Sequence, residues 1–387
     1  MEKINHRALV AAVILSTIGF LFYNVMPIYL GHLMDSKNLD YDQTGYMGSA
    51  FFLAFSIPSA SAYFWVNQIR PKNLSLASIF FICVFLYLST ITNSYMNLML
   101  EILFVGSFSG ILAAVAIAIL DQAKNQTRWF SVKTASESAA GTILLLLLPA
   151  TLIASYGFNG VVYGMLIFIA TVTPLVLSLS NSKLDVENKK PIISETSKGD
   201  LPKTTFCVIF ALLAVFCNFV TGSSIWAFAE RIADIRGFDP IVVGNALGMT
   251  LAFAIIGPAV SGLVSDRFGI KVPFLIFSVL MLFGAYGISA SSNLTGYIMA
   301  ACLNMFGWAA SIPFMYSLVS NADPNGRFIT LVASAVGLGS VVGPAIAGNL
   351  FGEQGSMLGL QLLVLVFMSL SITCGLKSFK PSDINHS

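Results

Sequence analysis

Long apolar runs follow one another through almost the whole chain, and short polar stretches separate them. Each run is continuous rather than alternating, which favours helices over the strands of a membrane barrel. A helix needs about 20 mostly apolar residues to cross the roughly 30 Å hydrocarbon core of a bilayer. The runs that meet this length predict twelve membrane-spanning helices, at residues 8–31, 44–66, 74–92, 97–120, 132–154, 160–180, 204–228, 241–265, 272–291, 294–319, 328–351 and 356–376.

The composition supports a multi-pass membrane protein. The 387 residues include only 20 Lys and Arg and 18 Asp and Glu, and 56% of the chain is hydrophobic. A soluble domain carries about 25% charged residues, whereas this chain carries 10%. Soluble enzymes, nucleic-acid-binding proteins and disordered proteins need more charge than this, so those classes are excluded.

The cations are distributed unevenly between the two predicted faces of the membrane. With the N-terminus placed in the cytoplasm, only Lys37, Arg231 and Arg236 of the 20 Lys and Arg residues fall on the opposite side. Cytoplasmic loops of membrane proteins carry an excess of Lys and Arg. We therefore expect both termini in the cytoplasm and the chain in the cytoplasmic (inner) membrane.

One hydrophilic stretch divides the chain into two similar halves. Residues 181–203 are rich in Lys and acids, which is typical of a solvated linker. They separate an expected N-terminal six-helix bundle, 1–180, from an expected C-terminal six-helix bundle, 204–387. The halves resemble each other, since Pro58 and Pro258 lie in corresponding helices and a basic loop follows each.

The second of these loops carries a recognisable motif. The stretch Gly262–Lys271 reads GLVSDRFGIK and resembles the signature loop of the major facilitator superfamily, G-x-x-x-D-R-x-G-x-K. The resemblance implies an all-α membrane fold in which two six-helix bundles are related by pseudo-two-fold symmetry, with the substrate site near the midplane between them. The first copy of the loop departs from the motif, because Asn67 stands where the Asp would be.

The resemblance also implies a conformational latch at this loop. Asp266, at the end of its helix, can accept hydrogen bonds from the exposed N–H groups of a facing helix N-terminus. The family suggests the fifth helix as that partner, where Arg128 and Lys133 lie. The latch set is Gly262, Asp266, Arg267, Gly269 and Lys271. The alternative is that Arg267 and Lys271 only determine the membrane topology.

In this superfamily the first, fourth, seventh and tenth helices line the central cavity, and each of them carries polar residues here. An unpaired polar group facing lipid costs several kcal/mol. Interhelical hydrogen bonds and interfacial anchoring are the alternative roles for such residues. The expected cavity residues are Tyr23 and Asn24, on one stripe with Ser16, and Glu101, Asn218, Thr221, Trp226, Asn304, Trp308 and Ser311.

Two carboxylates fall inside predicted spans, Glu101 in the fourth and Glu137 in the fifth. An acid buried in a membrane is costly and can take up and release a proton near neutral pH. Both are therefore candidates for proton coupling. The alternative is that each is a hydrated carboxylate near a helix end.

The absence of several residue types and motifs limits the possible substrates and energy sources. We expect no Lys or Arg inside a span, and phosphorylated or multiply anionic solutes need fixed cations. Neutral, hydrophobic or cationic solutes, or monoanions held by amides and hydroxyls, fit better. The His and Cys residues lack metal-ligand or disulfide spacing, and no phosphate-binding loop is present. No metal, cofactor or nucleic acid is expected.

The sequence therefore predicts a monomeric secondary transporter, not an enzyme, that works by alternating access and is driven by protons. Export of a neutral, hydrophobic or cationic compound is favoured, as in drug/proton antiporters of the superfamily. The fifth helix lacks the Gly-Pro motif of antiporters, so proton symport of a small neutral or monoanionic metabolite is the alternative. A receptor with the same fold is an alternative of another class.

Overall fold

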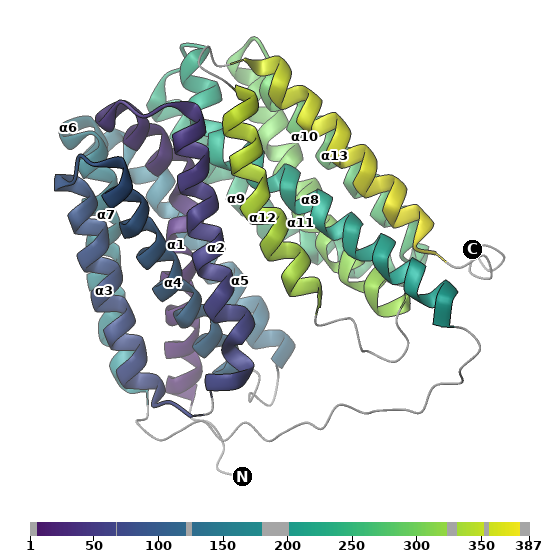
Figure 1. Cartoon of the computed structure of the whole chain (residues 1–387), viewed down its shortest axis with the longest axis horizontal. Coiled ribbons are helices and arrows are strands. Elements are labelled where there is room, and N and C mark those ends of the chain that lie inside the picture. The colour runs from purple at the N-terminus through teal and green to yellow at the C-terminus, as the bar shows by residue number, and fades with distance from the viewer. Residues whose placement is uncertain are drawn as a thin grey trace. The chain divides into compact units, whose positions relative to one another are not determined.

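The computed structural model describes residues 6–66, 68–120, 126–179, 201–322, 331–351 and 356–379, and these residues form twelve long helices (Figure 1). Eleven described helices are long and apolar enough to cross a membrane. The remaining long helix is α2, Tyr41–Trp65, which has 25 residues. The prediction of a twelve-helix membrane protein is confirmed.

The first half of the chain contains α1 to α7. Two of its membrane crossings end in irregular helix. The last turns after α5 form a π-helical segment, and α7 continues into a 3-10 segment named η2. The elements are α1 His6–Lys37, α2 Tyr41–Trp65, α3 Pro71–Ile91, α4 Tyr95–Leu120, α5 Gln126–Leu147, η1 Pro149–Ile153, α6 Ala154–Tyr156, α7 Phe158–Val172 and η2 Thr173–Ser178.

The second half contains six long helices without such interruptions in its described part. They are α8 Leu201–Ile235, α9 Pro240–Phe268, α10 Lys271–Ala290, α11 Leu294–Ala322, α12 Leu331–Phe351 and α13 Met357–Lys377.

The chain forms two compact units. The first comprises Met1–Asn188 together with Asp239–Gly248, and the second comprises Lys189–Phe238 together with Met249–Ser387. The first turns of α9 therefore belong to the first unit. Most of the predicted linker, 181–203, lies outside the described residues, and the division at 180 and 204 stays a prediction.

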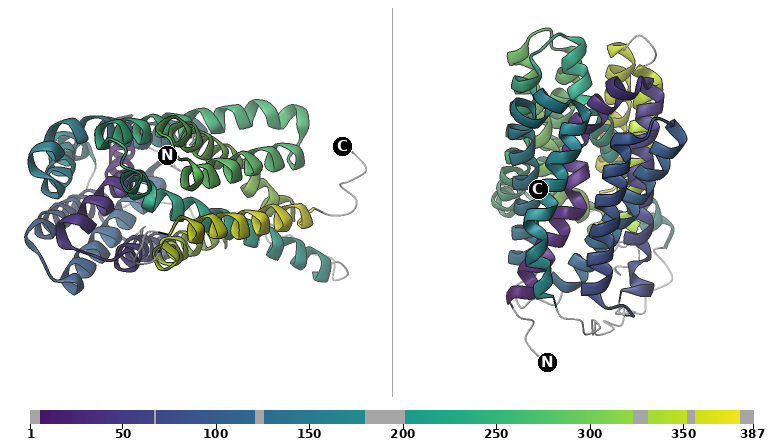
Figure 2. Two further views of the ribbon diagram at one scale, coloured as in Figure 1. Left: turned by 90° about the horizontal axis from the view of Figure 1, so that it is seen from above. Right: turned by 90° about the vertical axis from the view of Figure 1, so that its left-hand side faces the viewer.

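The two units share several corresponding helix contacts. In the first unit α1 packs against α4, α5 and α7, and α3 packs against α4 and α7. In the second unit α8 packs against α11, α12 and α13, and α10 packs against α11 and α13. Within each unit the long helices run side by side (Figure 2). The internal repeat that the prolines indicate is therefore present in the packing.

One hydrogen bond also recurs in the two units. Ser59 of α2 donates its hydroxyl to the carbonyl of Gly110 in α4 at 3.2 Å. Ser261 of α9 donates to the carbonyl of Ala310 in α11 at 2.7 Å. Small residues at such contacts let two helix backbones approach closely, which is typical of packing in membranes.

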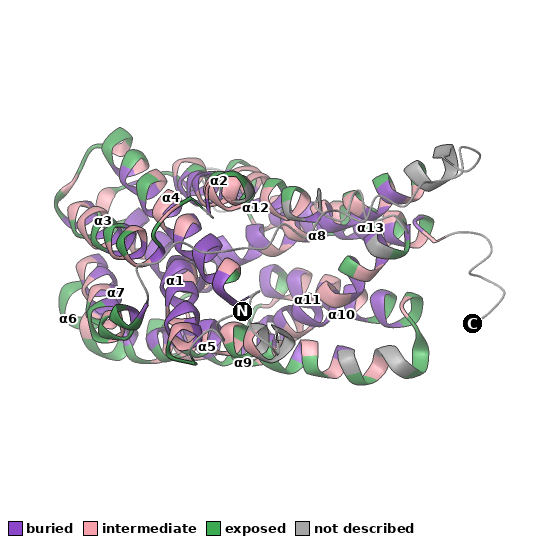
Figure 3. Cartoon of the chain, turned by 90° about the horizontal axis from the view of Figure 1, so that it is seen from below, coloured by how far each residue is buried: buried purple, intermediate pink, exposed green. Residues whose placement is uncertain are grey.

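Burial separates the central helices from the peripheral ones. The most apolar window of α1 is 78% buried, whereas that of α13 is 28% buried. Figure 3 shows α1 as a mostly buried helix, while α3 and α7 present exposed faces. Polar side chains on α1 must therefore find partners inside the protein, because neither water nor lipid surrounds this helix.

Candidate functional site

The main polar contact of the first unit is an ion pair within α5. Lys133 Nζ lies 2.9 Å from Glu137 Oε1, one helical turn further along, and the two side chains are only 12% and 10% exposed. The hydroxyl of Ser16, on α1, donates a hydrogen bond to the same carboxylate oxygen. The buried Glu137 carboxylate is thus neutralised by the Lys133 ammonium and accepts a hydrogen bond from Ser16, as buried charges require.

Further contacts bind α1 to α5 around this pair. The hydroxyl oxygens of Thr17 and Ser136 lie 3.0 Å apart, and Asn24 Nδ2 donates to the backbone carbonyl of Glu137 at 2.9 Å. The ammonium of Lys133 lies 4.7 Å from the centroid of the Phe20 ring, a cation–π distance. We call the set Ser16, Thr17, Asn24, Lys133, Ser136 and Glu137 the α1–α5 polar cluster.

The position of Lys133 corrects one prediction. The expectation that no Lys or Arg lies inside a span is wrong, because Lys133 lies inside the predicted span 132–154 and inside the apolar span Val132–Tyr156 of the structure. Although Lys133 stands near the start of the span, α5 begins earlier, at Gln126, and α1 packs over it. A charge that looks like a boundary residue is thereby enclosed by protein.

The second acid, Glu101, has different partners. It lies on α4, is 7% exposed, and its Oε1 accepts a hydrogen bond from Thr92 Oγ1 at 2.6 Å. Its Oε2 is buried and has no hydrogen-bond partner among the described residues. Lys37 donates instead to the Thr90 carbonyl and to Asn93 Oδ1, each at 3.2 Å. Glu101 is therefore held at the end of α3 and is not part of the α1–α5 polar cluster.

The stripe predicted on α1 has two kinds of surroundings. Ser16 and Asn24 face α5 and bond to Glu137. Tyr23 is half-buried, and its ring packs edge-to-face on Phe52 of α2, with centroids 5.7 Å apart.

The second unit brings three of the predicted polar residues into its interior. Asn218 of α8 donates its amide to Met281 Sδ of α10 at 3.2 Å. Trp308 of α11 lies edge-to-face on Phe219, with centroids 5.8 Å apart. Three atoms of these predicted residues are buried and have no hydrogen-bond partner among the described residues: Asn218 Oδ1, Asn304 Oδ1 and Trp308 Nε1.

A glycine makes room for the tryptophan. Gly222 follows Asn218 by one turn of α8, and a Cβ built on it would lie 3.0 Å from Trp308 Nε1. The indole N–H therefore lies against the α8 backbone, beside Met281. The predicted residues of this unit thus provide one uncharged donor and two uncharged acceptors that are buried, and such groups can orient a polar solute.

Two of the other predicted cavity residues, Thr221 and Ser311, bond within their own helices. Thr221 Oγ1 donates to the Cys217 carbonyl at 3.2 Å, and Ser311 Oγ donates to the Trp308 carbonyl at 2.8 Å. Such bonds are a common way to satisfy hydroxyls in membrane helices. Trp226 is 5% exposed. Whether these residues line a cavity stays a prediction.

Part of the predicted latch is described. Gly269 directly follows the last residue of α9 and has a φ of +64°, the left-handed conformation that favours glycine at a helix end. Arg267 is exposed, and the ammonium of Lys271 lies 5.9 Å from the centroid of the Phe379 ring. The surroundings of Gly262 and the side chains of Asp266 and Arg128 lie outside the described part of the structure, so the latch contact stays a prediction.

Sequence reasoning did not select Lys133 as a site residue, although a signal was present. Lys133 and Glu137 lie four residues apart in the first turns of the predicted span 132–154, and this spacing places them on one face of the helix. Ser16 was on the predicted stripe, but its contact with Glu137 joins residues 121 positions apart. No local pattern reports such a contact.

Comparison with known proteins relates the whole chain to one family. Residues 11–209 and 211–385 match the family model of the Major Facilitator Superfamily. A curated relative, the 4-hydroxybenzoate transporter PcaK of Acinetobacter baylyi, is 28% identical over 155 residues. That match covers 39% of this chain and 33% of the relative, so the chain spans about a third of the relative's length.

Solved structures share the fold at low sequence identity. The nucleoside transporter NupG superposes with a TM-score of 0.72 at 13% identity, over 96% of this chain and 98% of that one. A bacterial homolog of the human lysosomal transporter Spinster superposes with a TM-score of 0.70 at 14% identity, over 97% and 98%. At these identities the likeness shows the fold alone.

Proposed function

The chain belongs to the Major Facilitator Superfamily and is a multi-pass membrane transporter of small solutes, not an enzyme, and from this premise we propose that protonation of Glu137 drives its transport cycle. The observation that carries the proposal is the buried ion pair between Lys133 and Glu137, with Ser16 bonded to the same carboxylate oxygen. An intramembrane acid that faces protein partners is typical of proton relays in transporters.

The ion pair provides a physical rule for coupling. With Glu137 ionised, its charge and that of Lys133 cancel, and the empty site is neutral. A proton on Glu137 breaks the pair and leaves the Lys133 ammonium uncompensated in a low-dielectric interior, which is unfavourable. A bound monoanion restores neutrality. The site is therefore neutral either when empty or when it holds one proton and one monoanion together.

This rule favours symport of a small monoanion over the other mechanisms. The prediction of a neutral, hydrophobic or cationic substrate rests on the expected absence of cations from the spans, and Lys133 removes that ground. A cationic substrate would add a positive charge next to the ammonium. The relative PcaK is by name a transporter of 4-hydroxybenzoate, an aromatic monoanion, which supports the same substrate class.

Export of an uncharged compound is the second candidate. It is favoured by three uncharged side chains of the second unit, Asn218, Asn304 and Trp308, each of which has a buried polar atom without a hydrogen bond among the described residues. Glu101 is the second candidate for proton coupling, since one of its carboxylate oxygens is buried without a hydrogen bond among the described residues.

Transport in proteoliposomes under an imposed pH gradient tests the proposal. The panel comprises benzoate, benzyl alcohol and benzylamine, which share a ring and differ in charge. We expect an inward proton gradient to accumulate benzoate and to leave the other two unaffected. Accumulation of benzylamine under the reversed, outward proton gradient would instead support export by antiport.

Two variants identify the coupling residue. Glu137→Gln imitates the protonated acid, so we expect gradient-driven accumulation to fall at least about tenfold while exchange of internal for external benzoate persists. Lys133→Gln should lose both activities, because the cation that balances the anion is absent. Asp234→Asn, at an exposed ion pair with Arg231, is the matched control. Full accumulation by Glu137→Gln, with loss in Glu101→Gln, would assign coupling to Glu101.

A further inference from the structure

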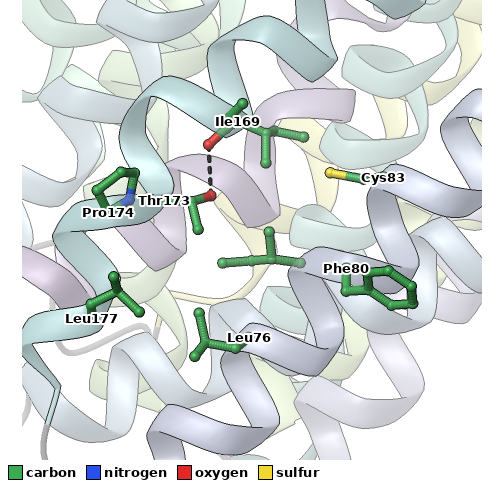
Figure 4. A pocket seen from close by; sticks show the side chains of 9 residues that line it. Leu76, Phe80, Cys83, Ile169, Thr173, Pro174 and Leu177 are labelled. Atoms are coloured by element: carbon green, nitrogen blue, oxygen red, sulfur yellow. Dashed lines mark hydrogen bonds between the residues drawn. The ribbon is translucent and has the colours of Figure 1, made fainter.

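A groove lies on the outer face of the first unit, between α3 and the end of the α7–η2 crossing (Figure 4). Its volume is about 380 Å³, at the lower end of the range for small-molecule sites. Both walls belong to the same unit and to membrane-spanning helices. The lining residues are Leu76, Ile79, Phe80, Cys83, Ile169, Ala170, Thr173, Pro174 and Leu177.

The groove is apolar and open to its surroundings. Phe80 is 62% exposed and Leu177 is 53% exposed, so both walls reach the outer surface. The single hydroxyl, on Thr173, donates to the Ile169 carbonyl at 2.6 Å, drawn as the dashed line in Figure 4. The groove thus offers no unpaired hydroxyl to a polar solute. In the hydrocarbon region, where water is absent, acyl chains fill such a surface.

A cation stands at one end of this groove. Lys72 lies one turn before Leu76 on α3, so it shares the face that carries the lining residues. Its ammonium donates to the carbonyl of Leu177, on the opposite wall, at 2.8 Å. An ammonium has three donors, so this bond leaves two of them for a ligand.

Other features place the cation at the membrane surface. Lys72 and Leu177 are each the second residue from an end of their spans, Pro71–Ile91 and Phe158–Ser178. Ser178 donates to the backbone carbonyl of Arg7 at 3.2 Å, so the start of α1 lies at the same end of the unit. The exposed residue Arg70 caps α3 there. This end is the predicted cytoplasmic face.

We propose that this groove binds one anionic phospholipid of the cytoplasmic leaflet, with an acyl chain between α3 and η2 and the phosphate on the ammonium of Lys72. The acyl chain gives little selectivity, because it exchanges one apolar environment for another. The headgroup gives the selectivity, since a cation at the membrane surface attracts anionic lipids. The proposal is independent of the transported solute.

Native mass spectrometry of the purified full-length protein tests the proposal. The protein is titrated with phosphatidylglycerol and phosphatidylcholine of identical acyl chains. We expect one phosphatidylglycerol to be retained with about fivefold preference over phosphatidylcholine, the effect of one surface cation. Lys72→Gln keeps the aliphatic stem and should bring the two lipids to equal retention.

A second variant tests whether an acyl chain occupies the groove. Cys83→Trp fills the inner end of the groove and leaves Lys72 in place, so it should lower the retention of both lipids. Lys377→Gln removes a cation from the last turn of α13 and is the matched control, with the preference intact. Thermal unfolding of each variant confirms that it is folded, and Ala170→Phe replaces Cys83→Trp if that variant is not.

Three outcomes would overturn the proposal. The first is equal retention of the two lipids by the unaltered protein. The second is an unchanged preference in Lys72→Gln. The third is displacement of phosphatidylglycerol by an uncharged apolar solute such as benzene, to the same extent in the unaltered protein and in Lys72→Gln. This result would assign the groove to apolar solutes instead.

Discussion

Glu137 and Glu101 are both buried acids in membrane spans, yet their partners give them different roles. Glu137 meets an ammonium and a hydroxyl from another helix, so a change in its protonation alters a charge pair. Glu101 meets a hydroxyl at the end of α3. Its protonation breaks no ion pair within 4.0 Å among the described residues. The residue type alone does not distinguish them.

The buried ion pair predicts a characteristic pattern of stability. Lys133→Met leaves the Glu137 carboxylate buried without its cation, which we expect to lower the free energy of unfolding by about 3 kcal/mol. The double variant Lys133→Met/Glu137→Gln removes both charges and should regain most of that loss. Thermal unfolding in detergent measures both effects. Equal destabilisation in the single and double variants would show that the two charges do not interact.

Individual polar residues of the second unit could be selected from the sequence, but their contacts could not. Asn218 and Trp308 are recognisable because amides and indoles are expensive in lipid. Their unpaired atoms depend on Met281 and Gly222, and neither of these is distinctive in an apolar helix.

At the level of elements, the apolar runs located the helices well, and proline accounts for the main differences. The predicted span 160–180 is an α-helix only as far as Val172, because Pro174 cannot donate to the helix ladder and the chain continues as a 3-10 segment. The span 132–154 likewise changes to a π-helical turn at Pro149. Hydropathy reports that a segment is buried in lipid, whereas hydrogen bonding decides which helix it forms.

Helix contacts depend on small residues at particular positions. Gly110 of α4 packs directly on the backbone of Phe55 in α2, and a Cβ built on it would overlap the Phe55 carbonyl oxygen. Its own carbonyl also accepts the bond from Ser59.

Gly110→Val should therefore separate α2 from α4 and lower the midpoint of thermal unfolding. The cost of overpacking a helix contact is about 1–3 kcal/mol. Leu100→Val, on an exposed face of the same helix, controls for the effect of a β-branched residue. A Gly110→Val protein as stable as this control would contradict the contact.

At the level of the whole molecule, the charges define the predicted topology and the signature loop defines the predicted latch. Gly269 follows α9 in a left-handed conformation. The positive φ of this backbone position explains why the motif has a glycine there. The partner of Asp266 remains a prediction from the family resemblance.

Asp266→Asn tests the latch. The uncharged amide is a weaker partner for the positive end of a helix dipole and for nearby cations. We expect the initial rate of benzoate uptake to fall at least about fivefold, with benzoate binding retained. Normal uptake at normal expression would contradict the latch, and Asp234→Asn again serves as the control because it removes a charge at an exposed ion pair.

The sequence by itself determined the number of spans, the repeat and the family, because these depend on hydrophobicity and motifs along the chain. It also predicted the side of the membrane from the cations. Only the tertiary structure decided that Lys133 is enclosed by protein and that Glu137 meets Ser16 rather than water. The physical reason is that burial of a side chain depends on which helix packs over it, and the contact of α1 with α5 joins residues more than a hundred positions apart.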